Sequence, residues 1–493
     1  MANLKSLFKD TAIYGLSSII GRFLNYLLVP LYTYAIDARS GGYGVVTNLY
    51  AYTALLLVLL TYGMETTFFR YANKSGEDPK KVYSTILASV LTTSVLFVAL
   101  VLLFLHPISS ALGYGDHPSY VWAMAATVAV DAFQCIPFAY LRYRNRPIKF
   151  AALKLLFISM NILLNLTYFV ILPKLGLNPG GIYDGGFEVG FVFYINLFCT
   201  AAVTFFFYPE LKGFRYGFDG PLMKRMLGYS WPILVLGIAG ILNQTADKIL
   251  FPFVYSGSDG DTQLGIYGAC AKIAMIMAMI TQAFRYAYEP FVFGNARERD
   301  SKETYAKAMK YFIIFTLLAF LCVTGSMNVL QYIIGADYRE GLKVVPVVMA
   351  AEIMMGIYFN LSFWYKLIDK TIWGAVFSGI GCAVLFAVNI LFINKIGYMA
   401  CAWGGFAGYG TAMLLSYFVG QKEYPIAYPL KSIALYVALA AVLFVGMTFA
   451  NRELGFWSAL GVNTVLILLF CAVIVRRDLP LSSLPRIGAR VRK

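Results

Sequence analysis

The chain is constrained above all by fourteen apolar stretches, each about 20 residues long and separated from the next by a short polar connection. A stretch of this length is what a helix needs to cross a bilayer. Charged residues make up 13% of the chain, whereas soluble proteins contain about 25%. This pattern predicts an all-α polytopic membrane protein and excludes a soluble enzyme, a disordered chain and a disulfide scaffold. The predicted spans are 11–36, 44–67, 83–105, 119–141, 150–172, 187–208, 229–254, 264–288, 307–334, 342–364, 372–394, 398–418, 432–450 and 456–475.

The basic residues predict the orientation of these spans. With both termini in the cytoplasm, 29 of the 40 Lys and Arg residues fall in cytoplasmic segments and six fall on the opposite side. Cytoplasmic loops of membrane proteins carry such an excess. The net charge of +15 therefore indicates topology, and we expect no nucleic-acid partner. Five cations remain inside the predicted spans, namely Arg22, Lys154, Lys248, Lys272 and Arg285.

The cysteines indicate neither disulfides nor a metal site. All seven lie in apolar stretches, and no pair has the spacing of a zinc site. The first apolar stretch is too long for the core of a cleavable signal, so we interpret it as the first span. The longest predicted connections, near 173–186, 209–228 and 289–306, leave no room for a soluble catalytic domain. We expect no cofactor.

A short pattern that occurs twice predicts an internal repeat. A Tyr-Gly pair opens a predicted span at Tyr43-Gly44 and again at Tyr267-Gly268, and in both cases the preceding span contains a proline. Repeated halves with a site at their interface are typical of transporters. The predicted domains are an N-lobe of six helices at 1–208, a cytoplasmic linker at 209–228, a C-lobe of six helices at 229–418, and helices 13 and 14 with a basic cytoplasmic tail at 419–493.

Polar groups within the first predicted helix are candidates for function. A charge at the bilayer centre costs about 2.5–3.5 kcal/mol even on a lenient scale, so it usually faces a cavity or a partner. Ser18, Arg22 and Asn25 follow i, i+4, i+7 spacing and share one face. We interpret this face as cavity-lining. The alternative is that Arg22 is paired only for packing.

The seventh predicted helix carries two polar stripes, Asn243 with Asp247 and Gln244 with Lys248. Asp247 and Lys248 are about 100° apart around the helix, so we expect that they do not face each other. We predict that Lys248, Asn243 and Gln244 line a cavity. The alternative is a hydrogen-bond network between helices.

The eighth predicted helix contains two further cations, which lie on different faces. Lys272 is interpreted as cavity-lining, and Arg285 as a gate or headgroup contact; for both, the alternative is a side chain that reaches out to the membrane surface. Desolvated carboxylates bind protons near neutral pH and often carry ion coupling. Proton or sodium coupling is therefore a hypothesis for the acids within the spans, and salt bridges to the cations are the alternative. These acids are Glu65, Asp131, Asp247 and Glu352.

Several short motifs, densest in predicted helices 1, 2, 7 and 8, indicate a family. They are Lys9–Gly15, Gly21-Arg22, Tyr43-Gly44, Gly63–Tyr71, Ser230–Pro232, Ala246–Lys248 and Gly265–Gly268. With these motifs and the fourteen-helix layout, the chain resembles the polysaccharide transporters of the multidrug/oligosaccharidyl-lipid/polysaccharide flippase superfamily. Relatives include O-antigen-type flippases and the lipid II flippase.

The resemblance implies two six-helix lobes in a V shape around a cationic cavity, with alternating access. It implies a flippase for an undecaprenyl-pyrophosphate-linked oligosaccharide in the bacterial inner membrane, used in surface polysaccharide biosynthesis. Glycan polymerases or glycosyltransferases would then be partners. By this analogy Arg22, Lys248 and Lys272 meet the pyrophosphate, and Arg285 is a fourth candidate. Lysine binds phosphate as a point charge, without the two-pronged contact of arginine.

Two other functions remain open from the sequence. A cation-coupled drug exporter of the same superfamily is expected to have an acidic cavity, whereas here five intramembrane cations accompany four acids. A membrane glycan polymerase or ligase usually needs a large outer loop with acids and histidines. The longest outer candidate, residues 173–186, contains Asp184 as its single acid. We therefore predict a transporter.

Overall fold

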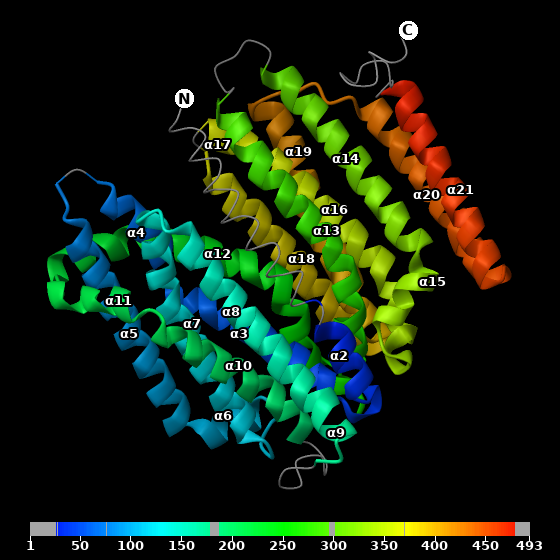
Figure 1. Cartoon of the computed structure of the whole chain (residues 1–493). Helices are drawn as coiled ribbons and strands as arrows, with labels where there is room; N and C mark the ends of the chain where they lie inside the picture. The colour runs from blue at the N-terminus through cyan, green and yellow to red at the C-terminus, as the bar shows by residue number, and fades with distance from the viewer. Residues whose placement is uncertain are drawn as a thin grey trace, which may run out of the picture. The chain divides into compact units, whose positions relative to one another are not determined.

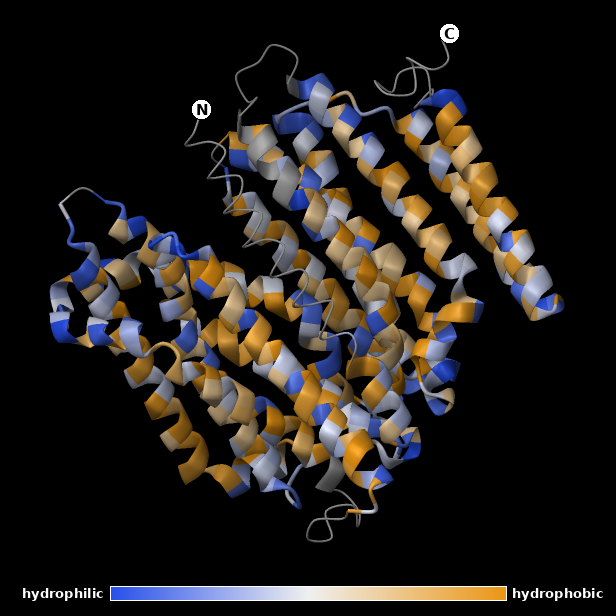
Figure 2. Ribbon diagram, in the orientation of Figure 1, coloured by the Kyte–Doolittle hydropathy of each residue, from blue (hydrophilic) through white to orange (hydrophobic). Residues whose placement is uncertain are grey.

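The computed structural model describes residues 26, 28–74, 76–177, 187–294, 301–368 and 370–478. Within these residues every regular element is a helix, and none is a strand (Figure 1). Hydrophobic residues run along most of the helices, and hydrophilic residues gather toward the helix ends (Figure 2). The predicted all-α class is therefore confirmed.

Contacts divide the chain into two compact units. The first contains residues up to Gly268 together with Asn389–Tyr398, and the second contains Ala269–Val388 and residues from Met399 onward. Two helices, α13 (Gly260–Gly294) and α18 (Ile372–Ile396), contribute to both units. The lobe boundaries at 208 and 229 remain a prediction.

The other elements of each unit follow one another with short connections. In the first unit these are α2 (Leu28–Ala35), η1 (Ala38–Ser40), α3 (Gly42–Thr61), α4 (Met64–Ala72), α5 (Pro79–Leu103), α6 (Leu105–Ala111), α7 (Pro118–Tyr143), α8 (Pro147–Leu166), η2 (Thr167–Ile171), α9 (Leu172–Lys174), α10 (Phe187–Phe205), α11 (Tyr208–Leu211), η4 (Lys212–Tyr216) and α12 (Gly220–Val254). In the second unit they are α14 (Ser301–Gly325), α15 (Met327–Leu330), η5 (Gln331–Ile333), η6 (Ala336–Val344), α16 (Val345–Leu361), α17 (Phe363–Leu367), α19 (Met399–Glu423), α20 (Leu430–Glu453) and α21 (Phe456–Arg477).

Eleven helices of the described chain are long and apolar enough to cross a membrane, or twelve if α10 and its bent continuation are one span. The chain is therefore a multi-pass membrane protein. Three of the fourteen predicted spans are not among the eleven. Residues 11–36 lie largely outside the described residues, 187–208 belong to the bent pair, and 398–418 correspond to α19, whose five glycines lower its hydropathy.

The two Tyr-Gly motifs meet where α3 and α13 begin. A Cβ placed on Gly44 would lie 1.9 Å from the backbone oxygen of Asp261, and one on Gly265 would lie 2.9 Å from the backbone nitrogen of Gly44. A Cβ on Gly268 would lie 2.3 Å from Oγ1 of Thr47. Because glycine has no Cβ, the two backbones can approach this closely. The motifs are therefore packing elements of one helix crossing within the first unit.

The segment predicted as a linker is largely helical. It contains α11 and η4, and α12 begins at Gly220, within the predicted 209–228. The side chain of Asp219 caps α12 by accepting a hydrogen bond of 2.9 Å from the Leu222 backbone N–H. Tyr208–Tyr216 is bent by 63° from the axis of α10. This segment therefore turns away from the direction of the span.

Candidate functional site

The polar face predicted for the first helix, formed by Ser18, Arg22 and Asn25, lies outside the described residues. Its role as a cavity lining therefore remains a prediction. The other predicted site residues are described. Those of the first unit lie in or beside two polar clusters, and the others belong to the second unit.

The first cluster, which we call the α12 cluster, is formed by Asp247, Lys248, Tyr267, Asn48 and Tyr114. The Nζ of Lys248 lies 3.0 Å and 3.1 Å from the two carboxylate oxygens of Asp247 and 3.1 Å from the backbone oxygen of Gln244. The expectation that Asp247 and Lys248 do not face each other was therefore wrong. A long lysine side chain bends around the helix and spans the angle between neighbouring positions.

Other helices hold the α12 cluster in place. The hydroxyl of Tyr267 donates a hydrogen bond of 2.6 Å to Asp247, and the amide of Asn48 donates one of 2.8 Å to the backbone oxygen of Lys248. The hydroxyl of Tyr114 donates to Asn48 at 2.7 Å. Burial raises the pKa of Tyr114 above its usual value, so this phenol stays protonated and remains a donor. Sequence reasoning missed Asn48 and Tyr114, because nothing in their spacing relates them to α12.

The two amides predicted to line a cavity differ in exposure. Asn243 is buried, and its amide donates a hydrogen bond of 2.9 Å to the backbone oxygen of Ala239. Gln244 is exposed. The structure therefore makes Gln244 the more accessible of the two.

The second cluster, which we call the α7 cluster, joins α4, α7 and α8. Glu65 of α4 forms an ion pair with Arg142 of α7 and accepts a hydrogen bond of 3.0 Å from the thiol of Cys135. Asp131 of α7 attracts the ammonium of Lys154 on α8, which also lies within electrostatic range of Glu65. The structure thus brings together two of the predicted coupling acids, Glu65 and Asp131.

Aromatic rings complete the surroundings of the cations in the α7 cluster. The Nζ of Lys154 lies 4.1 Å from the centre of the Phe138 ring, and the guanidinium of Arg142 lies 5.0 Å from the centre of the Phe69 ring. Cations are attracted to the faces of such rings. The sequence counted Arg142 among the cytoplasmic loop cations, whereas it is half-buried in the last turn of α7 against Glu65.

The remaining predicted residues, Lys272, Arg285 and Glu352, belong to the second unit. Lys272 and Glu352 are half-buried. Arg285 is exposed, and its guanidinium lies 5.0 Å from the centre of the Phe359 ring. Its role as a gate or headgroup contact remains a prediction.

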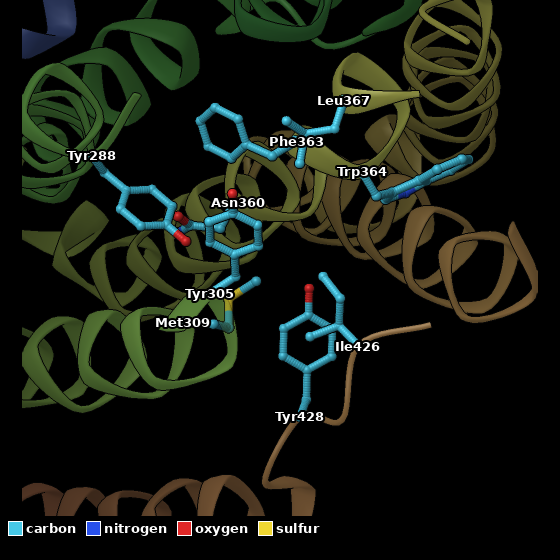
Figure 3. Close-up of a pocket in the computed structure, with 9 residues that line it drawn as sticks. All are labelled: Tyr288, Tyr305, Met309, Asn360, Phe363, Trp364, Leu367, Ile426 and Tyr428. Carbon is cyan, nitrogen blue, oxygen red and sulfur yellow. The ribbon is translucent and has the colours of Figure 1, made fainter. Parts of the chain in front are cut away.

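A small pocket in the second unit has a different character (Figure 3). None of its nine lining residues is charged, and five are aromatic. Such a lining does not suit a pyrophosphate, which needs cations or many hydrogen-bond donors. The lining residues are Tyr288, Tyr305, Met309, Asn360, Phe363, Trp364, Leu367, Ile426 and Tyr428.

Over the described residues, no group of three or more His, Cys, Asp or Glu side chains could hold a metal ion.

The fold of the chain is similar to that of membrane transporters of known structure. The lipid II flippase MurJ in an inward closed conformation matches with a TM-score of 0.69 and 14% identity, over 94% of this chain and 98% of that one. An inward-facing multidrug resistance MATE transporter of the MOP superfamily matches with a TM-score of 0.60 and 13% identity, over 84% and 94%. The MATE multidrug transporter DinF-BH matches with a TM-score of 0.58 and 17% identity, over 84% and 95%.

The sequence itself matches a family described as polysaccharide biosynthesis protein, over residues 7–287. No curated sequence matches the chain significantly. The family match covers more than half of the chain, and the related folds are those of transporters. The chain belongs to the polysaccharide biosynthesis protein family.

Proposed function

We propose that the chain is a flippase that moves an undecaprenyl-pyrophosphate-linked oligosaccharide from the cytoplasmic to the periplasmic leaflet of the bacterial inner membrane. The observation that carries this proposal is the match of residues 7–287 to a polysaccharide biosynthesis family. The fold, similar to that of a lipid II flippase, supports it. The transported glycan would serve O-antigen, capsule or exopolysaccharide biosynthesis, with polymerases or glycosyltransferases of the same pathway as partners.

The charges of the first unit favour an anionic substrate over an organic cation. Glu65 is paired with Arg142, Asp131 lies near Lys154, and Asp247 is paired with Lys248. A binding site for an organic cation needs a carboxylate that is free to face it. Two of these carboxylates are thus paired with a protein cation, and the third lies within electrostatic range of one.

Lys248 can bind pyrophosphate only by exchanging its present partners. Its ammonium has three hydrogens, and it has three acceptors, two on Asp247 and one on Gln244. We infer that an arriving pyrophosphate replaces Asp247, which then keeps its hydrogen bond from Tyr267. Arg22, Lys272 and Arg285 are the other proposed pyrophosphate contacts.

Transport would proceed by alternating access of two lobes and would be driven by a proton or sodium gradient. Glu65, Asp131, Asp247 and Glu352 are the proposed coupling acids. Protonation of Asp247 would release Lys248, because a neutral carboxyl holds an ammonium less tightly than a carboxylate does. This links ion binding and substrate binding at neighbouring residues.

The decisive experiment is reconstitution of the purified chain in vesicles with a fluorescent undecaprenyl-pyrophosphate-linked oligosaccharide. Accessibility of the sugar to an external glycosidase is measured with and without a pH or sodium gradient. We expect flipping by the wild type and loss of flipping in Arg22→Ala at unchanged protein yield. The matched control is Arg144→Ala, an exposed cation outside the spans. Absence of flipping by a folded wild-type protein would overturn the proposal.

Drug export is the second candidate, because MATE multidrug transporters share the fold. The same vesicles, loaded with a fluorescent organic cation and given a proton gradient, test it directly. Gradient-driven cation transport without oligosaccharide flipping would establish export instead.

A further inference from the structure

The end of the first unit that is predicted to be cytoplasmic carries a basic, aromatic platform formed by α11, η4 and the start of α5. In Figure 1, α11 lies beside α5 at this end of the unit. The segment Tyr208–Tyr216 is bent by 63° from α10, so it does not continue along the axis of that helix. A helical segment that turns aside at the end of a span is positioned to lie along the membrane surface.

The platform is fixed to α5 by close backbone packing. A Cβ placed on Gly213 would lie 2.3 Å from the ring of Tyr83, so glycine allows η4 to lie directly on that ring. The hydroxyl of Tyr83 donates to the backbone oxygen of Glu210 at 3.3 Å. The Nζ of Lys81 donates to the backbone oxygen of Tyr216 at 3.1 Å. The basic residues of η4 are therefore held at defined positions.

Two cations converge on Tyr216. The Nζ of Lys80 lies 5.5 Å and the guanidinium carbon of Arg215 lies 5.2 Å from the centre of the ring. Arg215 also donates a hydrogen bond of 3.1 Å to the hydroxyl of Tyr216. Lys212 lies on the same short helix, above the ring of Tyr208. Gathering like charges raises their mutual repulsion, which a bound anion relieves.

The acids around the platform have partners other than the ammonium or guanidinium groups of Lys80, Lys212 and Arg215. Glu210 pairs with Lys149 at 2.6 Å, and Glu77 pairs with Arg225 at 2.8 Å. Asp78 and Asp219 cap the first turns of α5 and α12. Lys80, Lys212 and Arg215 thus form no ion pair with these acids.

Exposed aromatic side chains lie directly beside these cations along the chain. Phe205 is 81% exposed, Tyr208 is 68% exposed and Phe218 is 56% exposed. Aromatic rings next to basic residues are typical of protein surfaces that rest at the headgroup level of a bilayer. The cytoplasmic leaflet is rich in anionic lipids, and each nearby Lys or Arg contributes to binding them.

We propose that Lys80, Lys212 and Arg215 form a binding site for the phosphate headgroup of an anionic phospholipid in the cytoplasmic leaflet. The flanking aromatic residues enter the interfacial region and hold the lipid beside η4. Its residues are not among the predicted pyrophosphate contacts, and it does not depend on the transported substrate. The bound lipid anchors α11 and η4, which connect the two halves of the sequence, at the membrane surface.

The test uses the full chain in phosphatidylcholine vesicles that contain a trace of spin-labelled lipid. Electron paramagnetic resonance measures the fraction of label immobilised by the protein. We expect labelled phosphatidylglycerol to be preferred over labelled phosphatidylcholine by at least about threefold. The preference should fall to about one in K80Q/K212Q/R215Q, because the three cations of the platform are gone.

A matched variant separates a defined site from general attraction. R144Q/R146Q/K224Q removes the same charge from exposed positions outside the platform and should keep the preference. Gly213→Ala keeps every charge but pushes η4 away from Tyr83, and it should lower the preference. An equal decrease in both triple variants would overturn the proposal in favour of diffuse attraction.

The source of the phosphate is tested in the same vesicles. Excess inorganic phosphate should leave the preference unchanged, because a lipid anchored in the bilayer stays at high local concentration. Loss of the preference on adding inorganic phosphate would overturn the lipid assignment and identify a general phosphate site. Oligosaccharide flipping, measured separately, is not required for either result.

Discussion

The α12 cluster and the α7 cluster of the first unit both contain carboxylates paired with cations. In one cluster the ion pair lies within a single helix, and in the other it connects two helices. In the α12 cluster, Lys248 and Asp247 are neighbours on one helix. In the α7 cluster, Glu65 and Arg142 join α4 to α7, and Asp131 of α7 lies within electrostatic range of Lys154 on α8. The ion pair between Lys248 and Asp247 can open without moving a helix, whereas an ion pair between helices, as in the α7 cluster, holds those helices together.

This difference indicates how each cluster serves the molecule. A pair within one helix is suited to exchange a carboxylate for a substrate phosphate, since the helix keeps its position. A pair between helices stabilises one arrangement of the bundle, and breaking it leaves a charge without its partner. Substitutions in the α7 cluster should therefore act on stability first, and substitutions in the α12 cluster should act on transport first.

The largest effect is expected for Lys154→Ala. It removes the cation that attracts the carboxylate of Asp131 inside a span, and we expect a loss of about 2 kcal/mol in the free energy of unfolding. This loss is smaller than the roughly 3–5 kcal/mol expected when one partner of a fully buried ion pair is removed, because Lys154 is half-buried. Thermal unfolding of the purified protein in detergent measures it. The double variant Asp131→Asn/Lys154→Met removes both charges and should recover most of the stability. If the double variant were as unstable as Lys154→Ala, the attraction between Asp131 and Lys154 would not explain the loss.

Lys248→Ala is expected to act mainly on transport. We expect flipping to fall about tenfold, equivalent to about 1.4 kcal/mol, because one phosphate contact is lost. The melting temperature should change little, since both members of the pair lie on α12. Asp247→Asn is the control: it frees Lys248 and should retain flipping in the absence of a gradient. If Lys248→Ala lowered stability and transport together, Lys248 would be a packing residue.

Glu65→Gln is expected to cost about 1 kcal/mol or less. The side chains of Glu65 and Arg142 are 38% and 32% exposed, and solvent screening weakens such pairs. The difference in melting temperature between wild type and variant should shrink as salt is raised. A difference that is independent of salt would mean that the hydrogen bond from Cys135, rather than the ion pair, carries the effect.

Hydropathy and turn residues predicted most of the spans, because a bilayer imposes length and apolarity on each helix separately. Two differences between the predicted and the observed helices have local causes. The start of α12 was predicted at 229 but lies at Gly220, because the cap at Asp219 extends the helix into polar sequence. The helix α19 is not apolar enough to count among the eleven membrane spans, because its glycines take the place of larger apolar side chains.

The site was less predictable than the fold. The sequence singled out Glu65, Asp131, Asp247 and Lys248, since charges within spans are visible in a single sequence. It did not predict their partners. Arg142 lies 77 residues from Glu65, and Asn48 lies 200 residues from Lys248. Such contacts depend on which helices are neighbours, and a hydropathy pattern contains no information about neighbours.

An effect that depends on acid pH is expected at Asp478, an acid of the second unit that also joins different helices. Its carboxylate pairs with Lys310 of α14 and accepts a hydrogen bond from Tyr436 of α20. Burial opposes ionisation of Asp478, but these two contacts hold its pKa below the usual value. The ionised form is therefore favoured by folding, so its contribution is complete above the unfolded pKa of about 3.9 and is lost as the pH falls through the lower folded value. Thermal unfolding between pH 6 and pH 3 should show a smaller acid-induced loss in Asp478→Asn than in the wild type. An identical pH dependence in both proteins would show that this pair, unlike those of the α7 cluster, does not stabilise the packing of its helices.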